Sequence, residues 1–165
     1  RKTRLTRLKN EKSTNIKRRW DFLLSVNGDD NMAVSEYTNL TIRRHTKGGI
    51  PTLPFVAVKE AILGKKYELS LSFPNLETAR ELHSEWKNKE NPVDVLAFPL
   101  DEYEGEIILT LAMARKQASL YDHSYLEHVL FLFIHACLHL KGFEHGDIME
   151  KQEQKYLKKF YSKTM

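Results

Sequence analysis

The chain has little cysteine and no long apolar run, and both absences exclude classes of protein. Cys137 is the one cysteine among 165 residues, so neither an internal disulfide nor a zinc site built on several cysteines can form. The longest unbroken apolar run, Val129–Ile134, is far shorter than the roughly 20 residues that a membrane-spanning helix needs. The N-terminus lacks the apolar stretch of a secretory signal peptide. We therefore expect no membrane partner and a reducing compartment, the cytoplasm.

Charge is distributed unevenly along the chain, although the formal net charge is only +4. Residues 1–19 contain nine of the 26 Lys and Arg residues and one of the 22 acidic residues, which leaves the remainder mildly acidic. This composition predicts a basic, flexible N-terminal tail over residues 1–19. Such a tail could bind nucleic acid, serve as a solvated leader, or act as an organelle transit peptide, so organelle import stays open.

Residues 20–165 fit one domain of ordinary size, and a hydrophobic fraction of 41% is enough for a core. Periodicity and turn signals predict strands at 21–26, 37–42, 67–73, 93–98 and 105–110, and helices from 52 or 53 to 64, after Asn75, and at 112–120, 124–141 and 148–161. The helix after Ser124 is apolar almost all round, which indicates burial. We expect an α+β fold in which a small mixed sheet packs with helices around this central helix.

Three histidines lie at the end of the predicted central helix in the pattern H-x3-H-x2-G-x2-H. His135 and His139 are four residues apart and therefore share one face of the helix. Gly142 ends the helix and allows His145 to return toward the same point. Three imidazoles without thiolates suit Zn²⁺ and leave one coordination position open, as in catalytic zinc sites. We predict one zinc ion per chain; the alternative is three ordinary boundary histidines, whose burial without partners is costly.

The same spacing occurs in zinc proteases with the pattern H-E-x-x-H-x-x-G-x-x-H, where the glutamate after the first histidine is the general base. Ala136 occupies that position here, so a protease mechanism of this kind lacks its proton acceptor. Cys137 is two residues from each helical histidine, on the opposite side of the helix, and we expect it in the core.

Three blocks of sequence together resemble the YbeY family of zinc-dependent rRNA maturation factors. "HACLHLKGFEH" (135–145) resembles the family signature H-G-x-L-H-L-x-G-Y-D-H, "NPVDVLAFPL" (91–100) resembles K-P-T-D-V-L-S-F-P, and "GEIIL" (105–109) resembles G-D-I-x-I. Single positions depart from these patterns: Val93, Ala97, Ala136, Phe143 and Glu144. Lys87 stands where the family has an arginine, which keeps the positive charge but loses the planar fork that grips phosphate.

The resemblance implies a single-domain metallohydrolase over residues 20–165, a zinc-dependent, single-strand-specific endoribonuclease. It would act in rRNA maturation, including small-subunit rRNA end processing, and in ribosome quality control. The implied partners are rRNA and the small ribosomal subunit or its proteins, with no small-molecule cofactor. The implied metal ligands are His135, His139 and His145, and Lys87 would contact a phosphate of the substrate. Glu144 would either transfer a proton or orient His145.

Two other functions remain alternatives at this stage. A metal-stabilised ribosome-assembly factor that binds without cutting would fit the mildly acidic body, and a metalloprotease is suggested by the ligand spacing alone. Trp86 and Phe143 could stack on bases, whereas Phe98 is better explained as core, and His128 lies too far along the helix to be a ligand.

Overall fold

The computed structural model describes residues 4–27, 32–87 and 94–161 of the chain. The helices are α1 (Arg4–Asn27), α2 (Phe55–Leu63), α3 (Leu76–Lys87), α4 (Leu111–Gln117), the 3₁₀ helix η1 (Ala118–Tyr121), α5 (Tyr125–Lys141) and α6 (Asp147–Tyr161). The strands are β1 (Ala33–Tyr37), β2 (Leu40–Arg44), β3 (Glu68–Phe73), β4 (Val95–Asp101) and β5 (Glu104–Leu109).

The strands form one mixed sheet in the order β1-β2-β3-β5-β4. The central pairs β2/β3 and β3/β5 are parallel, and the outer pairs β1/β2 and β4/β5 are antiparallel hairpins. Both parallel connections pass through a helix or a longer segment, as parallel pairing requires. The prediction of an α+β fold with a small mixed sheet is confirmed.

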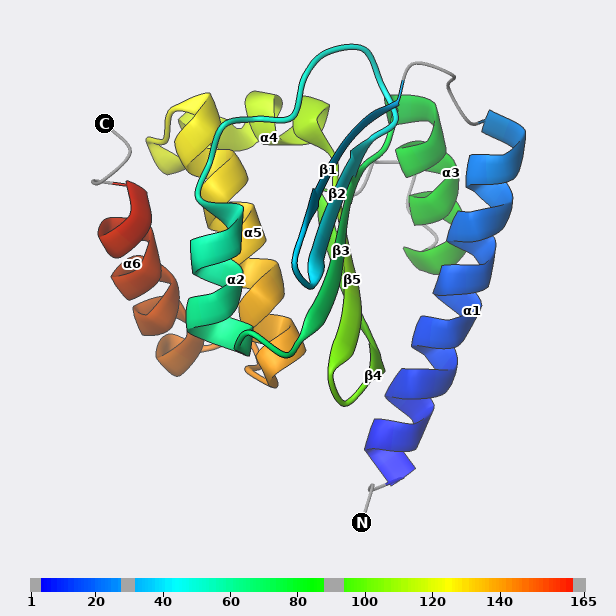
Figure 1. The fold of residues 1–165 in the computed structure, drawn as a ribbon, viewed down its shortest axis with the longest axis horizontal. Coiled ribbons are helices and arrows are strands. Elements are labelled where there is room, and N and C mark those ends of the chain that lie inside the picture. The colour runs from blue at the N-terminus through cyan, green and yellow to red at the C-terminus, as the bar shows by residue number, and fades with distance from the viewer. Residues whose placement is uncertain (1–3, 28–31, 88–93, 162–165) are drawn as a thin grey trace.

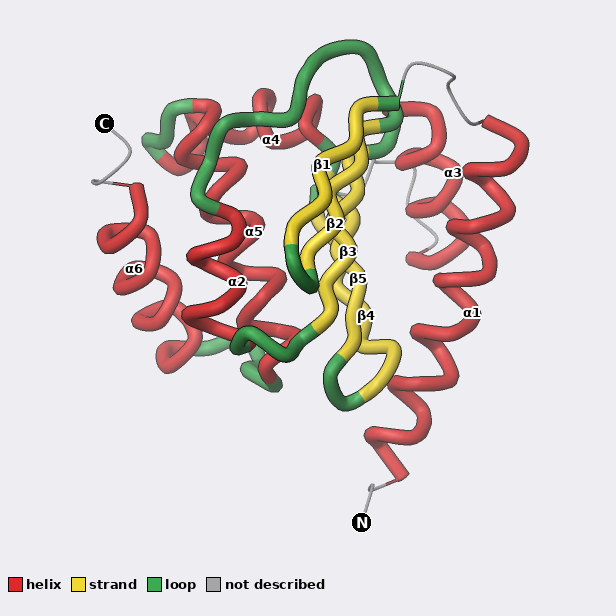
Figure 2. Tube along the Cα trace, viewed as in Figure 1, coloured by secondary structure: helices red, strands yellow, loops and turns green. Residues whose placement is uncertain are grey.

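Helices cover both faces of the sheet (Figure 1). In the view of Figure 2, α1 and α3 lie on one side of the yellow strands, and α2, α5 and α6 lie on the other. On that second side α5 lies between the sheet and α6, and its residues from Val129 to Leu138 are buried except Phe131 and His135. The prediction of a buried central helix carrying the histidines is therefore confirmed.

The core beside α5 follows the alternation expected of β3. Leu69, Leu71 and Phe73 point into it, and each is at most 3% exposed. Ile107 of β5, paired with Leu71, adds to the same layer. Burying each such side chain stabilises the fold by about 1.5–3 kcal/mol, so this layer holds α5 firmly in place.

The second core lies between the sheet and α1, and it corrects the strand expected at residues 21–26. Trp20 and Leu23 of α1 are buried against Phe98 and Ile108, which also confirms Phe98 as a core residue. The strand predicted at 21–26 is wrong, because these residues lie in the last turns of the helix α1, where Leu23 faces the core. The predicted division of the chain at residue 19 falls inside α1, so no break in secondary structure marks it.

The docking of α1 includes an ion pair between a half-buried lysine and a buried glutamate. Lys17 Nζ lies 3.1 Å from Oε2 of Glu106, whose side chain points from β5 toward α1 and is almost fully buried. Burial raises the pKa of the Glu106 carboxyl, and the nearby Lys17 charge counters that shift. The C-terminal half of α1 is therefore attached to the body by both apolar and ionic contacts.

Other boundaries differ from the predictions for local reasons. The strand predicted at 37–42 is interrupted by a turn, in which Asn39 has a φ of 58° that asparagine tolerates better than most residues. Helix α2 begins at Phe55 with Pro54 as its N-cap, two or three residues later than the predicted start at 52 or 53. The helix predicted at 112–120 ends at Gln117 and continues as η1. Residue 93, the predicted start of β4, lies outside the described residues.

Candidate metal centre

The ends of α5 are capped as the sequence predicts. The Ser124 hydroxyl accepts a hydrogen bond from the backbone N–H of Glu127 at 3.2 Å, which satisfies one free donor of the first turn. Gly142 has a φ of 115°, and its N–H donates to the carbonyls of Leu138 and His139. This left-handed residue ends the helix and turns the chain back across its last turn.

The turn brings His135, His139 and His145 together. The Nε2 atom of His139 lies 3.0 Å from Nε2 of His135 and 3.0 Å from Nε2 of His145. All three ligand nitrogens lie within 4.8 Å of one another. His135 and His139 are half-buried and His145 is exposed, so the cluster opens to solvent on the side of His145.

One side-chain acceptor and one backbone acceptor determine which nitrogen carries the proton in the rings of His135 and His139. His135 Nδ1 lies 2.7 Å from a carboxylate oxygen of Glu153, and His139 Nδ1 lies 3.0 Å from the carbonyl oxygen of Phe143. Both oxygens can only accept hydrogen bonds from a ring, so each Nδ1 carries the proton and donates it. When both rings are neutral, the Nε2 atoms of His135 and His139 then present lone pairs to each other.

Two nitrogen lone pairs held 3.0 Å apart repel unless a cation lies between them. The donor set, three neutral imidazole nitrogens with second partners on two of the rings, fits a borderline divalent metal ion. On this chemistry the three histidines could hold a metal ion, and no sulfur or carboxylate ligand is needed.

Glu153 is the part of the centre that the sequence analysis missed. Glu153 is 6% exposed. It lies one turn after Met149 and one turn before Leu157, which are both buried core residues of α6. A carboxylate at a core position of an amphipathic helix requires a partner, and that requirement is the signal that could have found it. His135 is that partner.

The remaining candidate residues are placed as follows. Ala136 and Cys137 are buried, and burial raises the pKa of the Cys137 thiol, which confirms the cysteine as a core residue. Glu144 is exposed beside His145. Lys87 is the last residue of α3, on the other face of the sheet from α5, and its side chain lies outside the described part of the structure.

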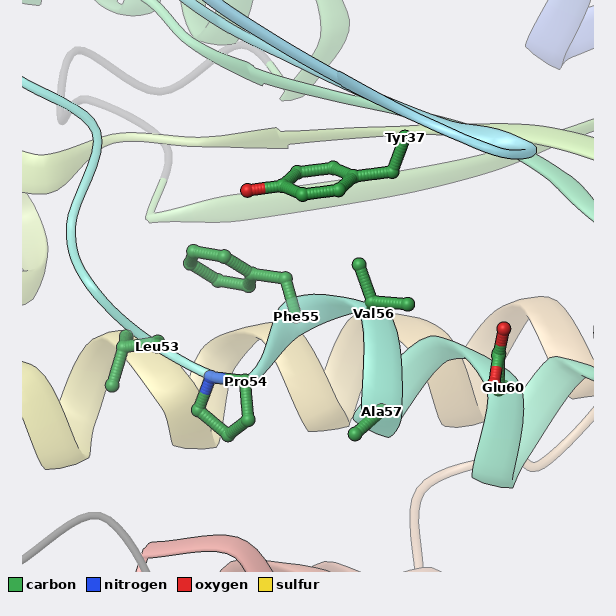
Figure 3. Close-up of a pocket in the computed structure, with 7 residues that line it drawn as sticks. All are labelled: Tyr37, Leu53, Pro54, Phe55, Val56, Ala57 and Glu60. Atoms are coloured by element: carbon green, nitrogen blue, oxygen red, sulfur yellow. The ribbon is translucent and has the colours of Figure 1, made fainter.

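A surface pocket elsewhere contains none of these histidines. It has a volume of about 340 Å³ and is lined by Tyr37 of β1 and by residues 53–57 and 60 in and before α2. Figure 3 shows the Tyr37 ring lying across from Phe55 and Val56, with Glu60 farther along the helix. The lining is largely apolar and offers no metal-binding cluster, so this pocket is separate from the chemistry described above.

Fold and site together define a class: an α+β protein whose buried central helix presents a three-histidine metal centre. Within the described residues, no helix combines the length and the hydropathy of a membrane-spanning segment. The comparison with known families then places the chain more narrowly. The family model described as Endoribonuclease YbeY matches residues 35–162, and the chain belongs to this family. The match begins after α1 and includes all three histidines and Glu153.

Curated relatives named endoribonuclease YbeY agree with this placement. The protein from Finegoldia magna is 36% identical over 104 residues, which cover 56% of this chain and 68% of the relative. The protein from Carboxydothermus hydrogenoformans is 35% identical over 57% of this chain and 73% of its own length. The protein from Saccharopolyspora erythraea is 35% identical over 52% of this chain and 55% of its own length. The chain thus spans between about half and three quarters of these relatives.

A solved structure supports the fold alone. The solution structure of TM1509 from Thermotoga maritima matches with a TM-score of 0.50 at 24% sequence identity. The match covers 66% of this chain and 80% of that protein.

Proposed function

We propose that the protein is a metal-dependent endoribonuclease that acts in rRNA maturation. The observation that supports this most directly is the convergence of three Nε2 atoms, two of them on rings whose Nδ1 protons are held by fixed acceptors. Membership of the family described as endoribonuclease YbeY supplies RNA as the substrate class.

In this proposal His135, His139 and His145 hold one ion through their Nε2 atoms, and we propose Zn²⁺. A zinc ion held by three histidines supplies a water of near-neutral pKa and a Lewis acid for a phosphoryl oxygen. Glu153 and the Phe143 carbonyl orient two of the rings and keep their Nε2 lone pairs free for the ion. The open side at His145 is where a phosphodiester would approach.

The proton acceptor differs from that of the zinc proteases with similar spacing. Ala136 is 1% exposed and carries no acid or base, so the position after the first histidine contributes only packing. Glu144, exposed next to His145, is our candidate for proton transfer or for orienting that ring. We retain Lys87 as the proposed phosphate contact.

We further propose single-stranded rRNA as the substrate, with small-subunit rRNA ends among its targets. The small ribosomal subunit or its proteins would be the partners, in ribosome quality control as well as in processing. A cytoplasmic location remains our expectation from the near absence of cysteine.

The test combines metal analysis with RNA cleavage. The purified protein should contain about one zinc per chain and cut a single-stranded rRNA precursor. His139→Ala should lose both properties, because its Nε2 atom lies between those of the other two histidines. Lys141→Ala changes an exposed residue in the same last turn of α5 and should keep both.

Undiminished cleavage by a verified metal-free preparation would refute the metal-dependent mechanism. Specific RNA or ribosome binding by a metal-loaded protein that never cuts would favour the alternative of a non-catalytic assembly factor. Cleavage of a peptide library instead of RNA would favour the metalloprotease alternative.

A further inference from the structure

An open cavity of about 650 Å³ adjoins the metal centre between η1, α5 and the first turns of α6. Glu153 lines this cavity and also contacts His135 Nδ1 at 2.7 Å. Phe131, another lining residue, has its ring centroid 6.3 Å from that of His135. Two lining residues of the cavity therefore contact or neighbour His135, and the volume of the cavity falls in the usual range for small-ligand sites.

One wall of the cavity is aromatic. Tyr121, His123 and Phe131 line it, and the Tyr121 side chain is 54% exposed. The Tyr121 ring stacks on His123 with centroids 5.8 Å apart and an angle of 24° between planes, and it lies 5.7 Å from Phe131. A large exposed ring beside two others offers a face on which a flat heterocycle can stack.

This aromatic wall is held in place from behind by a buried histidine. His128 is fully buried, stacks on Phe131 at 5.6 Å, and lies 4.9 Å from the Tyr121 ring. Its Nδ1 atom is 3.1 Å from Nδ1 of His123, and Glu127 lies 3.5 Å from the other nitrogen of His123. Because these contacts order the rings before any ligand binds, stacking on them costs little conformational entropy.

A second wall of the cavity is polar and mainly acidic. It is formed by α6 and includes Asp147, Glu150, Lys151 and Gln154. Carboxylates repel phosphate groups, so this wall disfavours the backbone of a nucleic acid. They accept hydrogen bonds from N–H groups, and the exocyclic amines of adenine, cytosine and guanine are such donors. A cavity with one stacking wall and one accepting wall suits a base and not a phosphate.

We propose that this cavity binds a nucleobase of the RNA substrate, beside the nucleotide whose phosphodiester faces the three histidines. The assignment rests on the proposed function for its substrate class. It adds a binding site for a base with an exocyclic amine, in which Tyr121 is the stacking residue. The acidic wall then keeps the neighbouring phosphates outside the cavity and directed toward the histidines.

The test measures binding apart from cleavage. A short single-stranded RNA is titrated into the metal-free protein, and into its Tyr121→Ala, Tyr121→Phe and Tyr37→Ala variants. Tyr37 is a matched control, because it is 52% exposed and lines the separate pocket of Figure 3. Loss of one stacked base should weaken binding about tenfold in Tyr121→Ala, whereas Tyr121→Phe and Tyr37→Ala should bind like the wild type.

A second arm uses RNAs with a single abasic nucleotide placed in turn at each position. At one position the abasic nucleotide should weaken RNA binding to the wild type about tenfold. The same RNA should bind Tyr121→Ala about as tightly as the intact RNA does, since both changes remove the same stacking contact. With metal-loaded protein, Tyr121→Ala should raise KM by a similar factor and leave kcat near the wild-type value.

The outcomes separate the two proposals. Binding that depends on Tyr121 without any cleavage would sustain the base site and contradict the endoribonuclease. The base site alone would be overturned if RNA is cleaved, Kd and KM are equal in the Tyr121→Ala and Tyr37→Ala variants, and an abasic nucleotide weakens binding at no position. A peptide that binds this cavity in a Tyr121-dependent way, while RNA binding is unchanged, would also overturn it and assign the surface to a protein partner.

Discussion

Replacing Glu153 by glutamine tests the role of the carboxylate behind the metal centre. The side chain is 8% exposed, and Oε1 lies 2.7 Å from His135 Nδ1. Glutamine has nearly the same shape and keeps a carbonyl oxygen that can accept the same hydrogen bond. The substitution therefore removes the negative charge while keeping the packing, and Glu153→Ala removes both the charge and the acceptor.

The magnitude follows from the geometry. A short, mostly buried hydrogen bond to a charged group contributes about 1.5–3 kcal/mol. If the bond acts chiefly by orienting His135 and raising its basicity, the loss appears in metal affinity, where about 1.4 kcal/mol corresponds to tenfold. We expect zinc affinity to fall about tenfold in Glu153→Gln and about 100-fold in Glu153→Ala.

The assay is competition for zinc with a chromophoric chelator at fixed pH and ionic strength. Glu150→Gln is the matched control, because it removes the same charge from an exposed position one turn earlier in α6. NMR of the ring nitrogens adds a direct readout: in the wild type His135 should carry its proton on Nδ1, and Glu153→Ala should weaken that preference.

Equal zinc affinities for the wild type, Glu150→Gln and both Glu153 variants would refute this reasoning. So would a loss of affinity in Glu150→Gln as large as that in Glu153→Gln, since it would show a general effect of charge. Circular dichroism of each variant confirms that the comparison is made between folded proteins.

Two further predictions concern the stability of the elements around the site. Lys17→Met should destabilise the fold by about 1–2 kcal/mol in urea denaturation at neutral pH, whereas Arg18→Met, an exposed neighbour, should be near neutral. Because burial raises the pKa of Glu106 above its ordinary value of 4.5, the free energy of unfolding falls as pH rises from 4.5. Lys17→Met should steepen this fall, because it removes the charge that counters the shift, and an unchanged pH profile would contradict the prediction. Gly142→Ala should cost roughly 1–2 kcal/mol through its φ of 115°, with Gly49→Ala as the unstrained control, and equal unfolding midpoints for the two would contradict the strain argument.

Sequence alone determined the features that depend on neighbours within a few residues. The spacing of His135 and His139 sets them on one helical face, and Gly142 allows the return that brings in His145. Ser124 and Asn75 were correctly predicted as caps, and the Asn75 side chain accepts a 2.8 Å hydrogen bond from the Thr78 N–H. Such contacts recur at fixed offsets, so a pattern in the sequence is sufficient to predict them.

Tertiary structure decided the contacts between elements that lie far apart in the chain. Glu153 reaches His135 only because α6 packs against α5, and the cavity at Tyr121 exists only because the fold brings the end of η1 and residues of α6 to the same place. The apolar run at 21–26 illustrates the same limit, since four to eight apolar residues are compatible with a strand or with one face of a helix. Its packing against Phe98 and Ile108 settled the matter, because burial selects the conformation that local propensity leaves undetermined.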